Sequence, residues 1–394
     1  MTKDIKLTLR TLKINSLKIV IKTLHGLEEV LMKEVELLGG QNIKKRKRAV
    51  ECEGKLPFLY EANLNLRTAL RILVPVYEFT ARNETELYNQ VKSFDWSQFL
   101  DVRQTFAIDN TIFSEYFTHS KYAALKMKDA IADQFREKFD LRPSVDVEKP
   151  DILFNLHAYQ DKFTISLDSS GRLLNQRGYR EPGHQAPLNE VMAAGLLQLA
   201  GWNKSIPLVD PMCGTGTIII EAVLMGLNIP PQINQKEFGF KNWNNFQPMM
   251  WNRIRAESQG KIRSAPLMIS GGDIDGHAVA LAKGALKKLR MGRDVQIRQV
   301  AFEDFIPKFQ TGMIITNPPY GERIGEEVDS LYKKLGDSFK NNFSDFDAWV
   351  LSSNIPALKQ LHLKPSEKMA LFNGALQVQF CKYNLQEGAY LEEE

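Results

Sequence analysis

The sequence IITNPPYGER, residues 314–323, places an amide, two consecutive prolines and an aromatic ring directly after an apolar run. Two consecutive prolines remove two backbone donors and fix two φ angles, so the segment fits neither a helix interior nor a central strand. The side-chain oxygen of Asn317 and the carbonyl oxygen of Pro318 could each accept one N–H of an exocyclic amine. The rigid corner would hold both acceptors in place, which reduces reorganisation during a reaction. These residues predict a site that orients an amine.

Tyr320 follows at the same corner. Its ring can stack on a nucleobase that has been taken out of its helix, which selects an aromatic and unstacked target. The amine of such a base is a poor nucleophile because its lone pair is delocalised into the ring, and two acceptors favour a pyramidal nitrogen. We therefore expect a catalytic site formed by Asn317, Pro318, Pro319 and Tyr320.

A glycine turn lies earlier in the chain, in LVDPMCGTGTIIIEAVLM at 208–225. Gly214 and Gly216 allow the backbone to approach a ligand closely, and the helix beginning near Thr217 directs N–H groups toward it. The third glycine of a dinucleotide fingerprint is missing, because Ile219 occupies its place. No Lys-Ser/Thr pair follows the glycines, as a phosphate-binding P-loop would require. On this segment alone, a purely structural strand-to-helix turn remains possible.

Two acidic residues follow later strands. Asp273 ends the strand at 268–273, where an acid can accept hydrogen bonds from ribose hydroxyls. Asp304, in VAFEDF, could receive the exocyclic amine of adenine. Asp275 is expected to cap the next helix. Each acid alone fits a cap or a surface charge, but together with the glycine turn and Asn317 they favour a nucleoside ligand that lacks phosphates.

The elements that carry these residues alternate between short apolar strands and helices, which predicts a parallel, doubly wound sheet. The first part of the chain reads differently. SLKIVIKT, GLEEVLMKEVELLGG and AVECEG predict a strand, a helix and a strand, and a second series of helices and strands occupies 58–168. Residues 1–15 lack strong periodicity and are expected to form a mobile arm.

Composition is that of a soluble globular chain: 394 residues, of which 43% are hydrophobic and 25% charged. No apolar run approaches the ~20 residues that span a bilayer, and the N-terminus lacks a signal-peptide core, so we expect a cytoplasmic protein without a membrane partner. Three cysteines and six histidines are scattered, which predicts no disulfide framework and no metal. The net charge of +4 gives only a mild preference for polyanions.

Taken together, DPMCGTGTIIIEA, GGDID, the region of Asp304 and NPPYGER resemble the motifs of class I S-adenosylmethionine-dependent methyltransferases that modify exocyclic amines. GRLLNQRGYR, PLNEVMAAGLLQLAGW and the N-terminal half resemble the THUMP-domain RNA methyltransferases, and most closely the bacterial large-subunit rRNA guanine-N2 methyltransferase family. The resemblance covers nearly the whole chain after residue 15, including the insert FGFKNWNNFQPMMW at 238–251.

This resemblance implies an α/β architecture in three parts. These are a ferredoxin-like module at 16–57, a THUMP RNA-binding domain at 58–168 and a Rossmann-like methyltransferase domain at 169–394. S-adenosyl-L-methionine is the implied cofactor. The motifs assign Asp210, Gly214, Gly216 and Thr217 to the cofactor loop, Asp273 to the ribose, Asp304 to the adenine, and Asn317, Pro318, Pro319 and Tyr320 to catalysis. Glu322 and Arg323 complete the signature without an assigned role.

RNA contacts are expected on the N-terminal half, at Lys44, Lys45, Arg46, Lys121 and Lys128, although solvated surface explains these residues equally well. The aromatic residues of the insert favour local packing over a base-stacking platform. Cys213, inside the cofactor turn, is better explained by packing than by covalent catalysis.

These features favour methylation of the N2 amine of a guanine in 23S rRNA, or in a large-subunit precursor, by a monomer. Two alternatives stay within the class: a tRNA guanine-N2 enzyme and a DNA adenine-N6 enzyme, although the resemblance of the N-terminal half to RNA-binding domains speaks against DNA. A catalytically silent RNA-binding assembly factor is the alternative from another class. The intact catalytic and glycine motifs speak against it.

Overall fold

The computed structural model describes residues 16–180, 188–289, 294–320 and 326–386. The expected mobile arm at 1–15 lies outside these ranges. The described chain divides into two compact units. The first consists of residues 16–22, 32–174 and 234–257, and the second of residues 23–31, 175–233 and 258–386.

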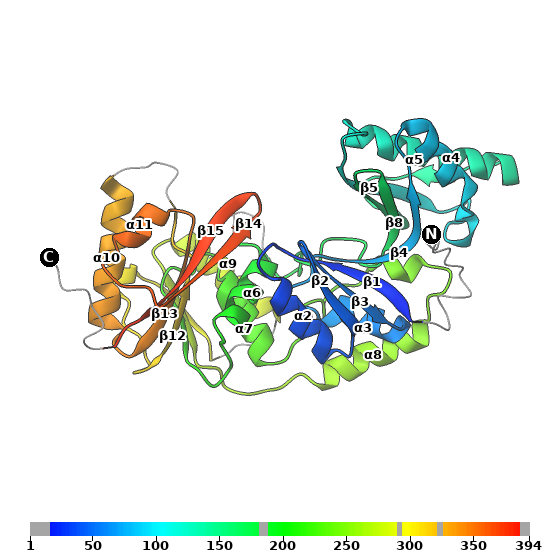
Figure 1. Ribbon diagram of the computed structural model, residues 1–394. Coiled ribbons are helices and arrows are strands. Elements are labelled where there is room, and N and C mark those ends of the chain that lie inside the picture. Colours follow the sequence, from blue (N-terminus) through cyan, green and yellow to red (C-terminus); the bar gives the residue numbers. More distant parts are fainter. Residues whose placement is uncertain (1–15, 181–187, 290–293, 321–325, 387–394) are drawn as a thin grey trace. The chain divides into compact units, whose positions relative to one another are not determined.

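The described chain opens with a β-α-β-β-α-β series, which belongs to the first unit apart from residues 23–31 (Figure 1). Its elements are β1 (Leu17–Lys22), α2 (Glu28–Leu37), β2 (Gln41–Arg46), β3 (Ala49–Gly54), α3 (Leu56–Asn65) and β4 (Arg71–Thr80). The strand order β2-β3-β1-β4 is that of a ferredoxin-like module. The module extends past the expected boundary at residue 57, because α3 and β4 are needed to complete the series.

The sheet continues into a second part. That part contains α4 (Glu84–Ser93), η1 (Trp96–Gln98), β5 (Thr105–Phe113), α5 (Ser120–Phe139), β6 (Ser144–Val145), β7 (Ile152–Tyr159) and β8 (Lys162–Asp168). All eight strands form one sheet in the order β2-β3-β1-β4-β8-β7-β5-β6. β4 joins the two parts, since its beginning pairs with β1 and its residues from Leu73 to Thr80 pair with β8. The register shifts between Pro75 and Tyr77, because proline cannot donate to the ladder.

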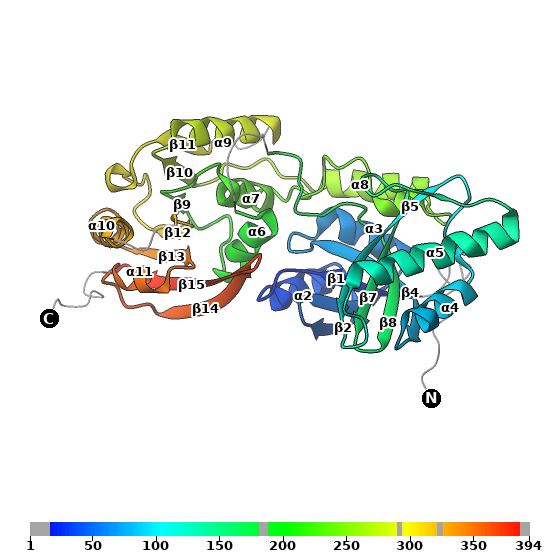
Figure 2. The same ribbon diagram turned by 90° about the horizontal axis from the view of Figure 1, so that it is seen from above.

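The two faces of this sheet differ in character. One face is apolar and covered: Ile19 and Ile21 of β1 are fully buried, and α4 and α5 lie over the strands of the second part (Figure 2). The other face is polar. Lys18 Nζ lies 3.3 Å from Glu78 Oε1 on this face, in the alternation expected of a sheet with one solvated side.

The aromatic insert belongs to the first unit, with η2 (Gly239–Asn242) and α8 (Pro248–Gly260). Its Phe240 ring is fully buried, with its centroid 4.5 Å from that of Tyr60 on α3. Phe238 and Trp251 lie in the same cluster. A Cβ at Gly239 would lie only 2.4 Å from the carbonyl oxygen of Asp168, so glycine permits this close approach. The prediction of local packing is confirmed.

The second unit contains a seven-stranded sheet. Its strands are β9 (Leu208–Asp210), β10 (Ile269–Asp273), β11 (Gln296–Gln299), β12 (Gly312–Thr316), β13 (Phe346–Ser352), β14 (Glu367–Asn373) and β15 (Leu376–Asn384). They lie in the order β11-β10-β9-β12-β13-β15-β14, and the first five are mutually parallel. β15 is antiparallel to both of its neighbours.

Helices cover both faces of this sheet (Figures 1 and 2). α6 (Glu190–Leu199), α7 (Thr217–Gly226) and α9 (Gly276–Leu289) lie on one side, and α10 (Glu326–Asn342) and α11 (Ile355–Lys359) on the other. The predicted doubly wound, Rossmann-like fold is confirmed. The chain order reverses between β9 and β12, and in such sheets the ligand crevice lies at this switch point, outside the carboxyl ends of the strands.

Candidate active site

The residues singled out from the sequence follow strands at the switch point. Asp210 ends β9, Asp273 ends β10, and Asn317 comes directly after β12. Because these strands are parallel and in register, their carboxyl ends lie at one edge of the sheet. The structure also joins two of the predicted cofactor residues directly: Gly214 N donates to Asp273 Oδ2 over 2.7 Å.

The glycine turn has room for a ligand. Gly214 and Gly216 have φ angles of +53° and +75°, in the left-handed region that favours glycine. A Cβ at Gly216 would lie 2.9 Å from the Cβ of Ala282 on α9, so packing requires glycine there. A Cβ at Gly214 would meet nothing within 4 Å. Open space at this point, ahead of Thr217 at the start of α7, fits a compact ligand held close to the backbone.

Asp210 is the buried acid of the site. Its side chain accepts from Met212 N over 3.3 Å, and the residue is only 2% exposed. Burial raises the pKa of Asp210 to about 7, although the neighbouring Thr316 hydroxyl acts in the opposite direction. The carboxyl group is therefore close to its midpoint of ionisation at neutral pH, and a cationic ligand would favour the ionised form.

Cys213 occupies the same turn. The residue is buried, and its N–H donates to the carbonyl oxygen of Gly272 over 2.8 Å. Burial, with a further contribution from Asp210, raises the pKa of the thiol well above its usual range. A neutral, buried thiol is a poor nucleophile, so the structure supports packing as the role of Cys213.

Asp273 is half-buried and keeps a defined orientation. Besides Gly214, its carboxylate accepts from Asp275 N over 2.9 Å. Asp275 in turn accepts from His277 N over 2.8 Å at the start of α9, so its predicted capping role is confirmed. Asp304 lies in the exposed turn η3 (Phe302–Asp304), not at a strand end.

Two isoleucines next to the acids were not identified from the sequence. Ile274 follows Asp273 directly and is 73% exposed, while Ile306 lies two residues after Asp304 and is 70% exposed. Large apolar residues in these positions leave surface that a planar ring could cover. An apolar residue directly after a strand-ending acid is the signal that could have found Ile274.

At the proline corner, the Tyr320 hydroxyl donates to Asn317 Oδ1. An amide oxygen has two lone pairs, so this bond leaves one of them for a substrate. Burial raises the pKa of Tyr320 above its usual range, which keeps the hydroxyl protonated as a donor. Pro318 is buried and Pro319 exposed. Glu322 and Arg323 lie outside the described residues.

A series of hydrogen bonds around the end of β13 holds this corner in place. Asn354 Nδ2 donates to the carbonyl oxygen of Tyr320 over 3.3 Å, and its Oδ1 accepts from Ala357 N to cap α11. Asn354 N donates to Ser352 Oγ, which also lies 2.7 Å from the hydroxyl oxygen of Tyr332. Sequence analysis missed these residues, because an ordinary strand end and helix cap do not reveal what they contact.

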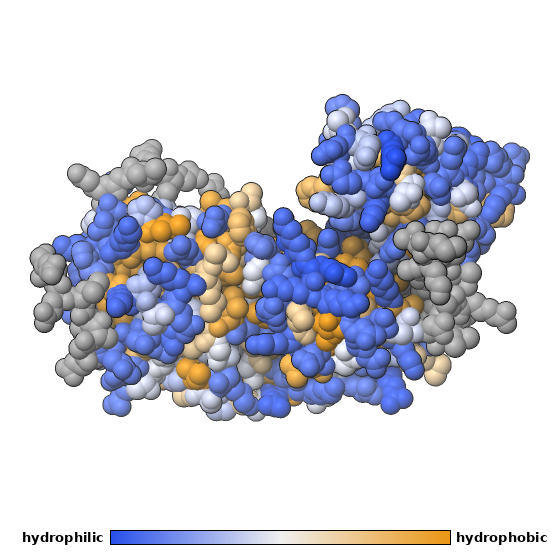
Figure 3. Space-filling model, viewed as in Figure 1, coloured by the Kyte–Doolittle hydropathy of each residue, from blue (hydrophilic) through white to orange (hydrophobic). Residues whose placement is uncertain are grey.

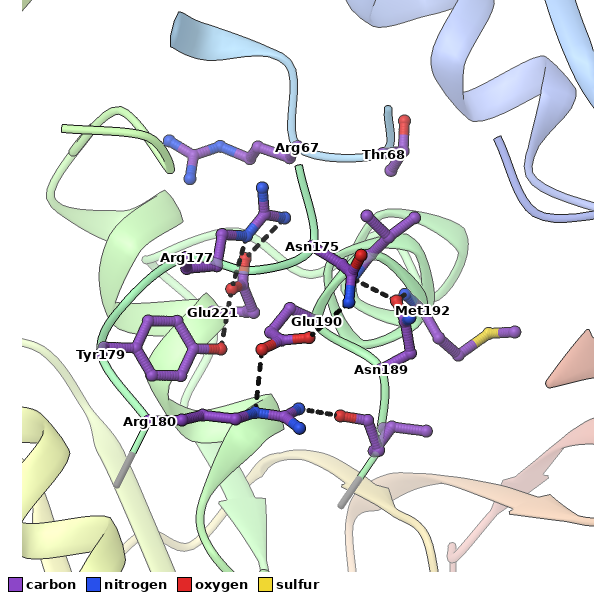
Figure 4. Close-up of polar contacts among 12 residues, drawn as sticks. Arg67, Thr68, Asn175, Arg177, Tyr179, Arg180, Asn189, Glu190, Met192 and Glu221 are labelled. Atoms are coloured by element: carbon purple, nitrogen blue, oxygen red, sulfur yellow. Dashed lines mark hydrogen bonds and ion pairs between the residues drawn. The ribbon is translucent and has the colours of Figure 1, made fainter. Parts of the chain in front are cut away.

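The segment before α6 is anchored by buried charges (Figure 4). Arg177 Nε lies 3.1 Å from Glu221 Oε1 on α7, and both side chains are fully buried. The Tyr179 hydroxyl donates to the same oxygen over 3.0 Å. Arg180 Nε lies 2.8 Å from Glu190 Oε1 on α6. The contacts to Glu221 fix the segment against α7, one helical turn after Thr217. They are strong because hydrogen bonds between charged groups are stronger than those between neutral groups.

The expected RNA-contacting residues all lie in the first unit. Lys44, Lys45 and Arg46 are exposed on β2, and Arg46 Nε is 3.2 Å from Glu51 Oε2. Lys121 is exposed at the start of α5. Lys128, further along the same helix, has its Nζ 2.9 Å from Asp129 Oδ1. Their roles stay predictions.

Among the residues that the structure describes, no group of three or more His, Cys, Asp or Glu side chains is arranged to hold a metal ion. None of the described helices has the length and apolar content that crossing a membrane requires.

Strand order, the glycine turn at the switch point and the acids that follow define a class I S-adenosylmethionine-dependent methyltransferase. The model of the RMKL-like methyltransferase domain matches residues 177–382. Models of the THUMP domain and the RlmL ferredoxin-like domain match residues 81–168 and 18–73. The chain belongs to the RMKL-like methyltransferase family, with a THUMP domain and an RlmL-type ferredoxin-like domain.

Relatives share this organisation. A Synechocystis sp. protein provisionally named as an RNA methyltransferase is 36% identical over 92% of this chain and 95% of its own length. Ribosomal RNA large subunit methyltransferase K/L of Syntrophotalea carbinolica is 35% identical over 92% of this chain, and the match covers 53% of that relative. The chain thus spans about half the length of the K/L relatives that it matches.

Solved structures agree with the fold. A methyltransferase crystallised with SAH (S-adenosylhomocysteine) superimposes with a TM-score of 0.85 at 29% identity, covering 94% of this chain and 99% of that one. A Listeria monocytogenes protein, named as a predicted N6-adenine-specific DNA methylase, gives a TM-score of 0.85 at 30% identity over 96% and 98%.

Proposed function

We propose that this methyltransferase transfers a methyl group to the exocyclic N2 amine of a guanine in large-subunit (23S) rRNA. One observation carries the proposal: Asn317 and Pro318 form a rigid corner directly after β12, at the switch point where β9 delivers the glycine turn. Donor and acceptor sites therefore lie at the same edge of the sheet.

The cofactor fits the residues at this edge. S-adenosylmethionine supplies a methyl group on a positively charged sulfur. Gly214 and Gly216 would admit it close to the backbone, and Asp273 would accept hydrogen bonds from its ribose. Asp304 and the exposed Ile274 would contact the adenine. The ionised form of Asp210 would favour the positive charge.

The proline corner would act on the nucleobase. Asn317 Oδ1 and the Pro318 carbonyl oxygen each accept one N–H of the amine, which directs its lone pair toward the methyl group. The N–C bond forms as the S–C bond breaks, and the amine then releases one proton. The Tyr320 hydroxyl fixes the amide orientation, while its ring stacks on the base.

The amine is a better match than a ring nitrogen. Guanine N7 carries no hydrogen in its neutral form, so two oxygen acceptors would face its lone pair and repel it. The adenine N6 amine satisfies the same geometry, and the Listeria relative is named for that reaction. The THUMP domain favours RNA over DNA, and Lys44, Arg46 and Lys121 would contact its phosphates.

Relatives favour rRNA over tRNA. The K/L relatives are named for the large ribosomal subunit, and they match over 91–92% of this chain. A tRNA guanine would satisfy the same catalytic corner. A catalytically silent assembly factor would not need the glycine turn or the oxygen pair. Titration with S-adenosylmethionine distinguishes an active methyltransferase from a silent assembly factor, since absence of cofactor binding would leave only the silent factor.

The experiment that tests the proposed function is mass mapping of methylated nucleosides in rRNA and tRNA from cells with and without the gene. We expect N2-methylguanosine to disappear from one position of 23S rRNA, with tRNA unchanged. Loss from tRNA alone, or loss of N6-methyladenine from DNA, would replace the proposal with one of its alternatives.

A further inference from the structure

Two aromatic side chains lie exposed on neighbouring strands of the first unit. Phe113 ends β5 and Tyr159 ends β7, and the two residues pair directly in the parallel register. Their exposed fractions are 62% and 64%. The surface visible around α4 and α5 in Figure 3 is mostly hydrophilic. Two rings exposed to this extent, at paired positions of neighbouring strands, present apolar surface that a partner could cover.

Both rings lie on the uncovered face of the sheet. Side chains alternate along a strand, and the register places Phe113 and Tyr159 on the same face as Lys162 of β8. Residues on the opposite face of β7, such as Phe154, are fully buried instead. The helices of this unit therefore leave the two rings available.

The turn beside the rings is well fixed. Gln160 follows Tyr159 with a φ of +56°, and its N–H donates to the carbonyl oxygen of Phe113 over 2.7 Å. The side chain of Gln160 accepts from Glu115 N over 3.3 Å. Neighbouring strands lie about 4.8 Å apart, so the backbone positions that carry Phe113 and Tyr159 have a fixed spacing before any ligand arrives.

Cations accompany the rings. Lys162 pairs with Tyr159 across the β7–β8 hairpin, is exposed, and makes no ion pair within the described part of the chain. The Arg82 guanidinium lies 6.0 Å from the ring centroid of Tyr116, a third exposed aromatic residue at this end of the unit, and its Nε lies 3.3 Å from Asp161 Oδ2. Rings for stacking beside cations for phosphates are the combination that binds single-stranded nucleic acid.

We propose that Phe113 and Tyr159 form a base-stacking platform for an unpaired stretch of the RNA substrate, with Lys162 and Arg82 contacting its phosphates. The inference rests on the proposed function, because the ligand is the RNA of the same enzyme. An unpaired stretch fits better than a duplex, since paired bases hide the faces on which rings stack.

Fluorescence anisotropy with the full chain tests the platform. The probes are a short labelled single-stranded RNA, a hairpin of the same composition, and the single strand with abasic riboses. The wild type should prefer the strand that carries bases. The double variant Phe113→Leu/Tyr159→Leu should weaken that binding by about tenfold or more, and should leave abasic and hairpin binding nearly unchanged.

Aromatic exchange provides the matched control, because Phe113→Tyr/Tyr159→Phe retains both rings and should retain the affinity. Lys162→Gln should weaken all three probes alike and reduce the salt dependence of binding. Unchanged affinity of the leucine variant, an equal loss on the abasic strand, or no binding of any probe by the wild type would overturn the platform.

The proposed function is tested in a separate experiment, which measures methylation of guanine in rRNA. A leucine variant that loses single-strand affinity while neither protein methylates guanine would retain the platform and reject the proposed function. Cofactor affinity and the temperature of thermal unfolding of the leucine variant should match those of the wild type. If the leucine variant is less stable, the folded variant Phe113→Tyr/Tyr159→Phe still tests the platform, because it should keep the single-strand affinity.

Discussion

The Asn317 amide already has one hydrogen-bond partner, the Tyr320 hydroxyl, and this contact assigns the tyrosine two tasks. Its ring can stack on a base, and its hydroxyl sets the direction of the amide oxygen. From the sequence, only stacking was expected. Nothing in the spacing of Asn317 and Tyr320 shows that the hydroxyl turns back, because that depends on the path of the chain through the two prolines.

Substitutions at the corner should separate these tasks. Asn317→Ala should lower kcat by about a hundredfold or more, because an oriented acceptor is lost, while cofactor affinity stays near the wild-type value. Tyr320→Phe keeps the ring and should cost about tenfold in kcat, the value of one orienting hydrogen bond. Steady-state kinetics and calorimetric titration give both quantities. A parallel loss of cofactor affinity in Asn317→Ala would contradict the assignment.

Substitution of Asp273 should change cofactor affinity, in contrast to the effect of Asn317 on kcat. Asp273→Ala removes the expected ribose acceptor and the acceptor for Gly214 N, so the dissociation constant for S-adenosylmethionine should rise by about tenfold or more. An unchanged dissociation constant in the same titration would count against Asp273 as a cofactor ligand.

Asp210 predicts a pH dependence. Burial raises its pKa from 3.8 to about 7, so the proton stabilises the folded, cofactor-free protein. That contribution is complete below about pH 4 and is lost as the pH rises through about 7. A cationic cofactor favours the carboxylate, so affinity should increase by about tenfold between about pH 5.5 and 7.5. Asp210→Asn should flatten this profile, and a profile equally steep in the variant would assign it to another group.

At the scale of elements, β9 and α7 bring the glycine turn, the proposed cofactor loop, to the switch point. Periodicity was enough to predict the doubly wound sheet, because apolar strands alternate with helices from β9 to β12. The later elements β13, β14, α10 and α11 were not predicted, and neither was β15. It lies antiparallel between β13 and β14, and strand order in a sheet is decided by pairing between distant segments. Asp304 lies in a 3₁₀ turn instead of a strand end, since β11 ends at Gln299.

The two glycines of the turn should respond differently. Gly214→Ala places a methyl group in open space, so it should cost about 1 kcal/mol of stability for its positive φ and weaken cofactor binding by about tenfold. Gly216→Ala presses on Ala282 and should cost about 2–3 kcal/mol. Denaturant unfolding and cofactor titration compare the pair. Equal losses of stability would contradict the idea that the space beside Gly214 serves a ligand.

At the scale of the molecule, the chain passes between its two units more than once, which the predicted linear boundaries at 57, 168 and 169 do not describe. Residues 234–257 interrupt the methyltransferase segment and join the first unit. Aromatic composition predicted that the insert packs, but its partner Tyr60 lies far away in the sequence. A local pattern cannot identify such a partner, because packing partners are set by the tertiary fold.

Scanning calorimetry should show this organisation. Phe240→Ala removes a fully buried ring of the first unit and should destabilise that unit by about 3–5 kcal/mol. S-adenosylmethionine, which we propose binds the second unit, should raise only the temperature of the transition that belongs to that unit. The cofactor affinity of the variant should match the wild type. A single transition that both changes shift together would show that the units unfold as one.

The proposed catalysis depends on an oxygen pair that holds a base amine against a methyl donor, and the position of the transferred methyl group tests this most directly. The purified protein is incubated with large-subunit rRNA and S-adenosylmethionine carrying a deuterated methyl group, and the nucleosides are analysed by mass spectrometry. We predict the label in N2-methylguanosine, and its absence with Asn317→Ala. Label on guanine N7 or on adenine, or equal labelling by the variant, would contradict the account.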